Sequence, residues 1–149
     1  MMLALNIVTI LCIGLLIGTE FAVAVFINPI LRKLDDRAQA NAIRLFAKRL
    51  GTAMPFWYAA SLLLLIVQAI LRRQESGDAL LIAACAIWVA VIIHTLFVLV
   101  PINNRMMKLD SNAFSAEEQR EHTKWDNLHR FRVAALMASM VCCLVAIGM

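Results

Sequence analysis

Four ionisable side chains interrupt long apolar stretches of this sequence and are the first candidates for chemistry. They are Glu20, His94, His129 and Arg132. A histidine can take up a proton near neutral pH, a nearby carboxylate tunes its basicity, and an arginine can stabilise a developing oxyanion. The four together could remove a proton from an acidic C–H or O–H group and stabilise the anion that results.

Two of these candidates lie in the segment TKWDNLHRFRVAAL, residues 123–136. Trp125, His129 and Arg132 are spaced by four and then three residues, which places them on one face of a helix. The last apolar stretch reaches the length needed to span a bilayer only if it begins near residue 128. We therefore expect His129 and Arg132 to lie inside the membrane boundary.

Four apolar stretches must position these side chains. The chain has 149 residues, of which 62% are hydrophobic and 16% charged, whereas about one quarter of a soluble domain is charged. The stretches cover about residues 3–27, 53–71, 79–100 and 128–148, and roughly 20 apolar residues suffice for a membrane-spanning helix. We expect one all-α domain over residues 1–149, an integral membrane antiparallel four-helix bundle. We interpret the first stretch as a membrane anchor, because no basic region precedes it.

The candidate side chains are predicted to share one depth in the membrane. Glu20, His94 and Arg132 each lie seven or eight residues inside the same boundary, which is roughly 10–12 Å at about 1.5 Å per residue. Ionisable groups at such depth usually face the bundle interior and pair. Glu20 and Arg132 are the obvious ion pair, with His94 and His129 beside it. The alternative is a purely structural pair that locks two helices, with His94 as a hydrogen-bonded core residue.

Basic residues predict the orientation of the bundle. Twelve Lys and Arg residues lie in or next to the two long connections, and only Arg72 and Arg73 lie in the short one. Positive residues favour the cytoplasmic side. The long connections should face the cytoplasm, and both termini should lie outside, in a bacterial inner membrane. A basic rim beside anionic lipids accounts for the net charge of +4 and needs no nucleic acid.

The chain also contains a short internal repeat. NPILRKLD at residues 28–35 and PINNRMMKLD at residues 101–110 each follow an apolar stretch and precede a polar helical one. Two parallel repeated hairpins would explain this pattern. We expect residues 38–50 to form a short amphipathic helix in the first cytoplasmic loop. Ser115 and Glu118 have the spacing of a capping box, so a helix should begin there and run into the fourth span.

Polar side chains near the cytoplasmic boundary are candidates for substrate binding. They are Asn28, Asn103, Asn104 and Trp125, two of which follow an expected helix break at Pro101. Glu20, His94 and His129 form the two-histidine, one-carboxylate set used by non-haem iron, so a metal is one option for a cofactor. The four cysteines contain no C-x-x-C motif, which argues against a thiol–disulfide relay.

Several of these motifs together resemble a known family. Asn28-Pro29, the lone His94, PINNR at residues 101–105 and WDNLHRFR at residues 125–132 are similar to the anthrone oxygenase-like family of small four-helix membrane proteins, many of them without assigned function. The resemblance spans nearly the whole chain and touches His94, Asn103, Trp125, His129 and Arg132. Fungal members of that family are associated with oxygenating anthrones to anthraquinones. The resemblance thus implies an oxidoreductase that acts on an apolar aromatic small molecule. Such a substrate would enter sideways from the lipid and lose a proton from an acidic C–H or phenolic O–H, and the resulting anion would react with O2.

Two other classes of function fit the same residues. In a haem-binding electron carrier, His94 and His129 would be axial ligands from different helices. In a non-enzymatic transport or accessory protein, the polar cluster would be a substrate gate. Four helices are few for a transporter, so that reading would require a homodimer. The expected partners are the lipid bilayer and an apolar small-molecule substrate.

Overall fold

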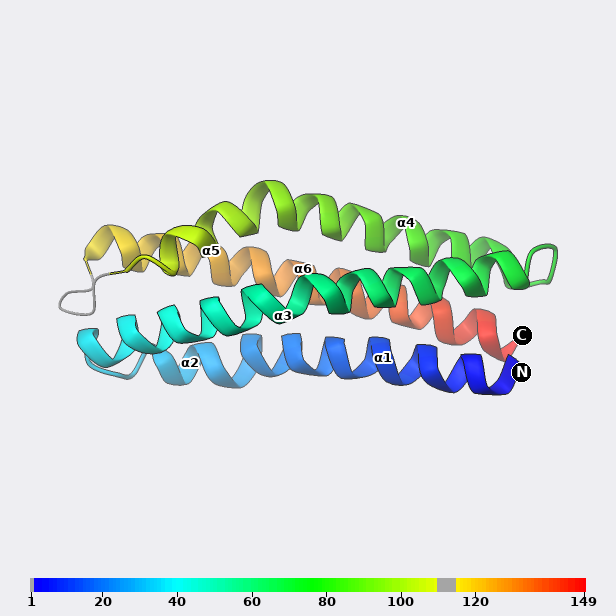
Figure 1. Ribbon diagram of the computed structural model, residues 1–149, viewed down its shortest axis with the longest axis horizontal. Helices are drawn as coiled ribbons and strands as arrows, with labels where there is room; N and C mark the ends of the chain where they lie inside the picture. Colours follow the sequence, from blue (N-terminus) through cyan, green and yellow to red (C-terminus); the bar gives the residue numbers. More distant parts are fainter. Residues whose placement is uncertain (1, 110–114) are drawn as a thin grey trace.

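The computed structural model describes residues 2–109 and 115–149, and every regular element among them is helical (Figure 1). Two elements, η1 and η2, are π-helices, in which the hydrogen bonds run from residue i to i−5. The elements in chain order are α1 (Met2–Ala22), η1 (Val23–Ile27), α2 (Asn28–Leu31), α3 (Asp36–Leu71), α4 (Asp78–His94), η2 (Thr95–Leu99), α5 (Val100–Met106) and α6 (Ala116–Gly148).

These elements form four long helical rods that pack as an antiparallel bundle. The rods cover Met2–Leu31, Asp36–Leu71, Asp78–Met106 and Ala116–Gly148, and each is long and apolar enough to cross a membrane. Contacts join α1 to α3, α3 to α4, α4 to α6 and α6 to α1, so each rod packs against two antiparallel neighbours. The protein is an integral membrane four-helix bundle, as the sequence predicts.

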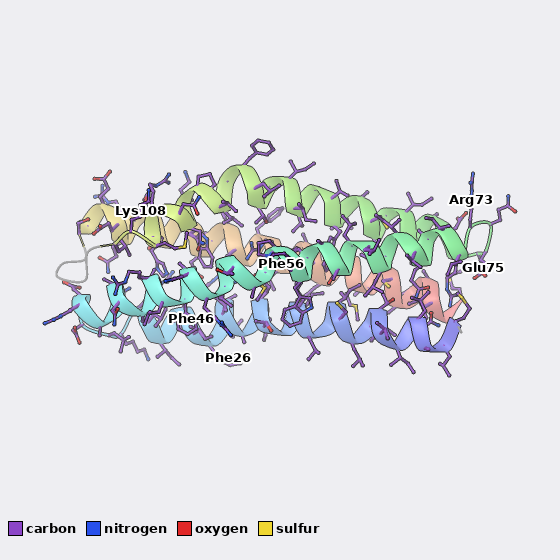
Figure 2. All side chains as sticks on the ribbon, in the orientation of Figure 1. Phe26, Phe46, Phe56, Arg73, Glu75 and Lys108 are labelled. Atoms are coloured by element: carbon purple, nitrogen blue, oxygen red, sulfur yellow. The ribbon has the colours of Figure 1, made fainter. Side chains whose placement is uncertain are left out.

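The two ends of the bundle differ in what they carry. The termini and the connection at residues 72–77 lie at one end, which we call the terminal end. The connection at residues 32–35, the end of α5 and the start of α6 lie at the other, which we call the basic end (Figure 1). Figure 2 shows Arg73 and Glu75 at the terminal end and Lys108 near the basic end. Phe26, Phe46 and Phe56 lie between them, and all three are exposed on the outside of the bundle. This distribution suits a protein surrounded by lipid.

The buried core is divided into two apolar clusters. The larger lies in the middle and toward the terminal end, with Leu16, Leu65, Trp88 and Leu136 at its centre. The smaller lies at the basic end and includes Ala40, Ile43, Ile102 and Met106. The ionisable candidates of α1 and α6 lie between these clusters in the chain, so polar groups are inserted into the bundle where the two apolar cores meet.

Both π-helices precede a proline. The Asn28 N–H donates to the Val23 carbonyl, and the Val100 N–H donates to the Thr95 carbonyl; Pro29 and Pro101 come next. A proline has no N–H and its ring crowds the carbonyl four residues earlier, so a wider turn before it relieves the clash. The expected helix break at Pro101 is therefore wrong, because the rod widens and continues as α5.

The internal repeat predicted from the sequence is visible in the order of elements. The first half of the chain runs α1, η1, α2 and α3, and the second half runs α4, η2, α5 and α6. In both halves a spanning helix widens into a π-helix, continues through an X-Pro-Ile sequence and returns as a helix of more than 30 residues. The repeated sequence thus marks the point where each first helix is deformed.

The expected amphipathic helix at residues 38–50 is not a separate element. These residues belong to α3, which runs without a break from Asp36 to Leu71. The face formed by Ala40, Ile43 and Ala47 is buried against α5 and its neighbours, whereas Leu45 and Phe46 are exposed. Packing inside the bundle, rather than binding flat on the membrane surface, therefore buries the apolar side of this segment.

The capping box at the start of α6 is confirmed. The Ser115 hydroxyl accepts from the Glu118 N–H at 3.2 Å, and the Glu118 carboxylate accepts from the Ser115 N–H at 2.7 Å. Two N–H groups that would lack a helical partner are thus satisfied. The helix begins twelve residues before the predicted span, so its first turns extend beyond the apolar stretch at the basic end.

Gly77 supplies a first prediction, because it packs directly on the backbone of α6. A Cβ at this position would lie 2.7 Å from the Ala146 carbonyl oxygen and 2.8 Å from its Cα. Backbone atoms cannot rotate away, so Gly77→Ala should destabilise the bundle by about 1–3 kcal/mol, as overpacking does. Thermal unfolding in detergent would measure this. Gly18→Ala is the control, because nothing lies within 4 Å of its new Cβ; an equal loss in both variants would contradict the prediction.

Candidate active site

Glu20, His129 and Arg132 form a buried cluster that joins α1 to α6. The Arg132 Nη2 donates to Glu20 Oε2 at 2.5 Å and approaches His129 Nδ1 at 2.9 Å. His129 Nδ1 also lies 3.1 Å from Glu20 Oε2. The three residues are 1–8% exposed. The ion pair predicted between Glu20 and Arg132 is present, and His129 lies beside it as expected.

The contacts of His129 define which nitrogen can accept a proton. Its Nε2 lies 3.1 Å from the Glu20 carbonyl oxygen, which can only accept, so Nε2 carries the hydrogen. In the neutral ring Nδ1 then has a lone pair and accepts from Arg132. If Nδ1 takes a proton, the Glu20 carboxylate at 3.1 Å becomes its partner. His129 is thus placed to gain a proton and to have the resulting charge stabilised by Glu20.

Aromatic and hydroxyl groups hold the cluster in place. Trp125 stacks on His129 with ring centroids 4.7 Å apart and planes within 10° of parallel. The Arg132 guanidinium lies over the Tyr58 ring, 5.6 Å from its centroid, and its Nη1 donates to Thr95 Oγ1 at 3.4 Å. Residues from all four rods therefore meet at this point. The rotamers of His129 and Arg132 are fixed from several sides, which is the arrangement that preorganised catalysis requires.

A cavity of about 430 Å³ lies against this cluster. Its polar wall includes Glu20, Thr95, His129 and Arg132, and most of its remaining surface is apolar, formed by α3 on one side and by α4, η2 and α5 on the other. This volume is within the range of about 300–1,000 Å³ that small-molecule sites occupy, and an apolar lining with a few convergent polar groups is typical of them. The site can hold an apolar molecule against an acid, a base and a cation.

A second, smaller cavity of about 50 Å³ lies toward the basic end. It shares Val23, Leu50, Asn103 and Trp125 with the larger one and also borders Asn28. Next to Asn28, the Asp126 carboxylate is fully buried; it accepts a hydrogen bond from Asn28 at 2.7 Å and one from Arg32 at 2.5 Å. These contacts connect α2 to α6 one turn away from His129, so they help to hold α6 in place beside the site.

Asp126→Asn should weaken this connection between α2 and α6 and lower the stability of the bundle. The substitution removes the charge that Arg32 and Arg130 share, and hydrogen bonds to charged groups contribute about 1.5–3 kcal/mol each. We expect a loss of about 2 kcal/mol in unfolding free energy, measured by denaturant titration in micelles. Asp36→Asn is a suitable comparison, because Asp36 lies exposed in the first turn of α3. Equal stability of Asp126→Asn and the parent chain would contradict this role.

The structure does not bring His94 into the cluster. His94 lines neither of the two cavities and makes no hydrogen bond or ion pair among the described residues. The inward face of α4 is marked by the buried residues Leu81, Ala84, Trp88 and Val91, and the next position at this spacing is Thr95. His94 precedes that position by one residue, or about 100° around the helix. Thr95 therefore takes the place that we expected for His94.

This position of His94 also affects the cofactor predictions. The two-histidine, one-carboxylate set of Glu20, His94 and His129 is not assembled, and residues 2–109 and 115–149 contain no cluster of three His, Cys, Asp or Glu side chains suited to a metal. The haem alternative required His94 and His129 to face one shared space, but only His129 borders a cavity. Neither the iron site nor the haem-binding pair therefore has the geometry that it requires.

The candidate substrate-binding residues divide into three groups. Asn103 and Trp125 line the larger cavity, and Asn103 donates to the Ala47 carbonyl at 3.3 Å. Asn28 is buried, holds Asp126 and borders only the smaller cavity. Asn104 is exposed and lines neither cavity. None of the four cysteines forms a disulfide.

Sequence reasoning missed Tyr58, Thr95 and Asp126 as parts of the site. Tyr58 is 6% exposed and packs on Arg132, so it belongs to the buried cluster. A usable signal was present, because Tyr58, Ser61, Leu65 and Gln68 lie at helical spacing on the buried face of α3. Asp126 lies three residues before His129 and could have been identified by the same spacing.

Comparison with known proteins identifies a family for this chain. No curated protein and no solved structure matches the chain significantly. A sequence profile of the anthrone oxygenase family, however, matches residues 42–142, which include Tyr58, Thr95, Asn103, Trp125, His129 and Arg132. The match covers about two thirds of the chain, and the protein therefore belongs to the anthrone oxygenase family.

Proposed function

We propose that the protein is an oxygenase that converts an activated methylene of an anthrone-type aromatic substrate to a ketone. The observation that carries this proposal is the buried Glu20–His129–Arg132 cluster on the wall of a 430 Å³ cavity inside a membrane bundle. The family match supports the reaction class. An apolar tricyclic molecule dissolves in the bilayer, so a membrane-embedded site suits it.

In the proposed reaction, His129 Nδ1 removes a proton from the methylene carbon next to the aromatic rings. The electrons pass to the substrate's carbonyl oxygen, and the enolate that results is stabilised by the Arg132 guanidinium. Glu20 stabilises the charged imidazole. The anion forms a C–O bond with O2, proton return gives a hydroperoxide, and loss of water leaves the ketone. The carbon is oxidised, and O2 supplies one ketone oxygen and one molecule of water.

We further propose that the basic end faces the cytoplasm. Twelve of the fourteen Lys and Arg residues lie toward that end of the rods or in its connections, and cytoplasmic segments carry an excess of basic residues. The site then lies in the cytoplasmic half of the membrane. Cysteine-labelling of single variants at exposed positions 37 and 75 in intact cells would test this, with residue 75 accessible from outside and residue 37 not.

The proposed reaction can be tested with purified protein in lipid nanodiscs. Anthrone and dissolved O2 are supplied, and anthraquinone is followed by its absorbance while an electrode records O2 uptake. We expect one O2 consumed per anthraquinone formed, at a rate well above that in empty nanodiscs, because anthrones also oxidise spontaneously. Equal rates with and without the protein would refute the proposal for this substrate class.

A further inference from the structure

The larger cavity meets the outer surface of the bundle on one side. Leu63 is 62% exposed, Leu96 is 56% exposed and Ile66 is 39% exposed, yet all three line the cavity. They belong to the second and third membrane spans, so their exposed surface contacts lipid chains. We call this place, bounded by Leu63, Ile66 and Leu96, the side opening. It lies between α3 and the α4–η2 rod.

The two helices that border the side opening are both irregular near its level. Pro55 lies inside α3 and lines the cavity, and η2 forms part of the facing wall. Prolines and π-helical turns are the usual causes of bends in long helices. Figure 1 shows α4 and the segment that follows it bowing away from α3 before the rod returns at α5. Each rod thus has a local cause of irregularity near the side opening, and the packing of the two rods leaves the space between them.

The side chains of α3 that line the cavity become wholly apolar from Tyr58 toward the terminal end. Tyr58 lies at the level of Arg132, whereas Leu62, Leu63 and Ile66 follow it one to two turns toward the terminal end. The polar side chains thus lie in the middle of the space and toward the basic end, and the part toward the terminal end, lined by Leu62, Leu63 and Ile66, is apolar and meets lipid. This distribution fits a molecule with an apolar body and one oxygen-bearing edge, held with that edge toward Arg132.

We propose that the side opening is the route by which such a ligand, a planar aromatic dissolved in the bilayer, reaches and leaves the site. The proposal rests on the proposed function only for the class of ligand. Leu63 and Leu96 form the passage but provide none of the polar contacts. Because both also line the cavity, truncating them removes some contact with the ligand, but their size should change the rates of binding and release by more than it changes Kd.

The test measures binding kinetics without turnover. The chain in phospholipid nanodiscs, kept under nitrogen, is mixed with anthraquinone, and quenching of the fluorescence of Trp125, which lines the cavity, is followed by stopped flow. Trp125→Phe gives the background from the other tryptophans. Leu63→Ala and Leu96→Ala should each raise the association and dissociation rates by about tenfold, and Leu96→Phe should lower both; in every variant Kd should change by less than either rate.

Leu15→Ala is the matched control, because Leu15 is also 62% exposed but lies on α1 and lines neither cavity. The proposal is overturned if this variant changes the rates as much as Leu63→Ala, if the variants change Kd at constant association rate, or if anthraquinone does not quench Trp125. If anthraquinone binds through the side opening but anthrone is not oxidised, the proposed function fails and the route stands. If anthrone is oxidised and the variants change no rate, only the route fails.

Discussion

Replacing His129 with asparagine is expected to lower the rate of anthrone oxidation by roughly 10²–10⁴-fold, the usual contribution of a general base. Asparagine keeps a polar group of similar size between Glu20 and Trp125, but its amide cannot take up a proton. The binding of anthraquinone should remain, because His129 makes up only part of the cavity wall. Turnover in nanodiscs, compared with anthraquinone binding to the same preparation, measures the two effects separately.

The matched control is His94→Asn. The substitution is the same, and the residue lies at a similar predicted depth, but His94 borders neither cavity. We expect turnover close to that of the parent chain. A loss of activity in His94→Asn equal to that in His129→Asn would contradict the arrangement of the site and would restore the role that the sequence alone suggested for His94.

Breaking the Glu20–Arg132 ion pair should produce the largest loss of stability. Removing one partner of a buried pair leaves the other charge without compensation and typically costs about 3–5 kcal/mol. Glu20→Gln leaves Arg132, which is 8% exposed, with only neutral neighbours, Thr95, His129 and Tyr58, in direct contact. Arg132→Gln leaves Glu20 in the equivalent position. Unfolding by sodium dodecyl sulfate in mixed micelles would measure both losses.

The double variant Glu20→Gln, Arg132→Gln measures how much of the lost stability comes from the interaction between the two side chains. With both charges gone, two neutral amides can hydrogen-bond to each other, so the double variant should be more stable than either single one. Arg105→Gln is the surface control, because Arg105 and Glu121 are a well-formed but exposed pair, and exposed pairs contribute little. Additive losses in the double variant would indicate that Glu20 and Arg132 do not depend on each other.

These two experiments also separate catalysis from structure. A purely structural pair, the alternative left open by the sequence, predicts that Glu20→Gln lowers stability without lowering the turnover of the fraction that remains folded. The proposed mechanism predicts that folded Glu20→Gln is also slow, because His129 Nδ1 loses the carboxylate 3.1 Å away that stabilises its proton. Turnover per folded molecule, counted by size-exclusion chromatography, distinguishes the two outcomes.

Composition and spacing alone determined the main features of this protein. Four apolar stretches of membrane length require four helices, since a lipid environment leaves the backbone no other hydrogen-bond partners. The cost of burying an isolated charge made the pairing of Glu20 with Arg132 predictable, and the four-and-three spacing placed Trp125, His129 and Arg132 on one face. The capping box located the start of α6 by the same kind of local rule.

Only the tertiary structure decided which face of α4 looks inward and where the cavity opens. Counting residues along a helix predicts how deep a side chain lies in the membrane but not which side of the helix it is on. Thr95 contacts Arg132, whereas His94, one residue earlier and about 100° around the helix, does not. The π-helices arise from the crowding of Pro29 and Pro101 against the preceding turn, and the space between α3 and η2 depends on how the two deformed rods pack. Packing between rods is a sum over many contacts, so no local pattern in the sequence encodes it.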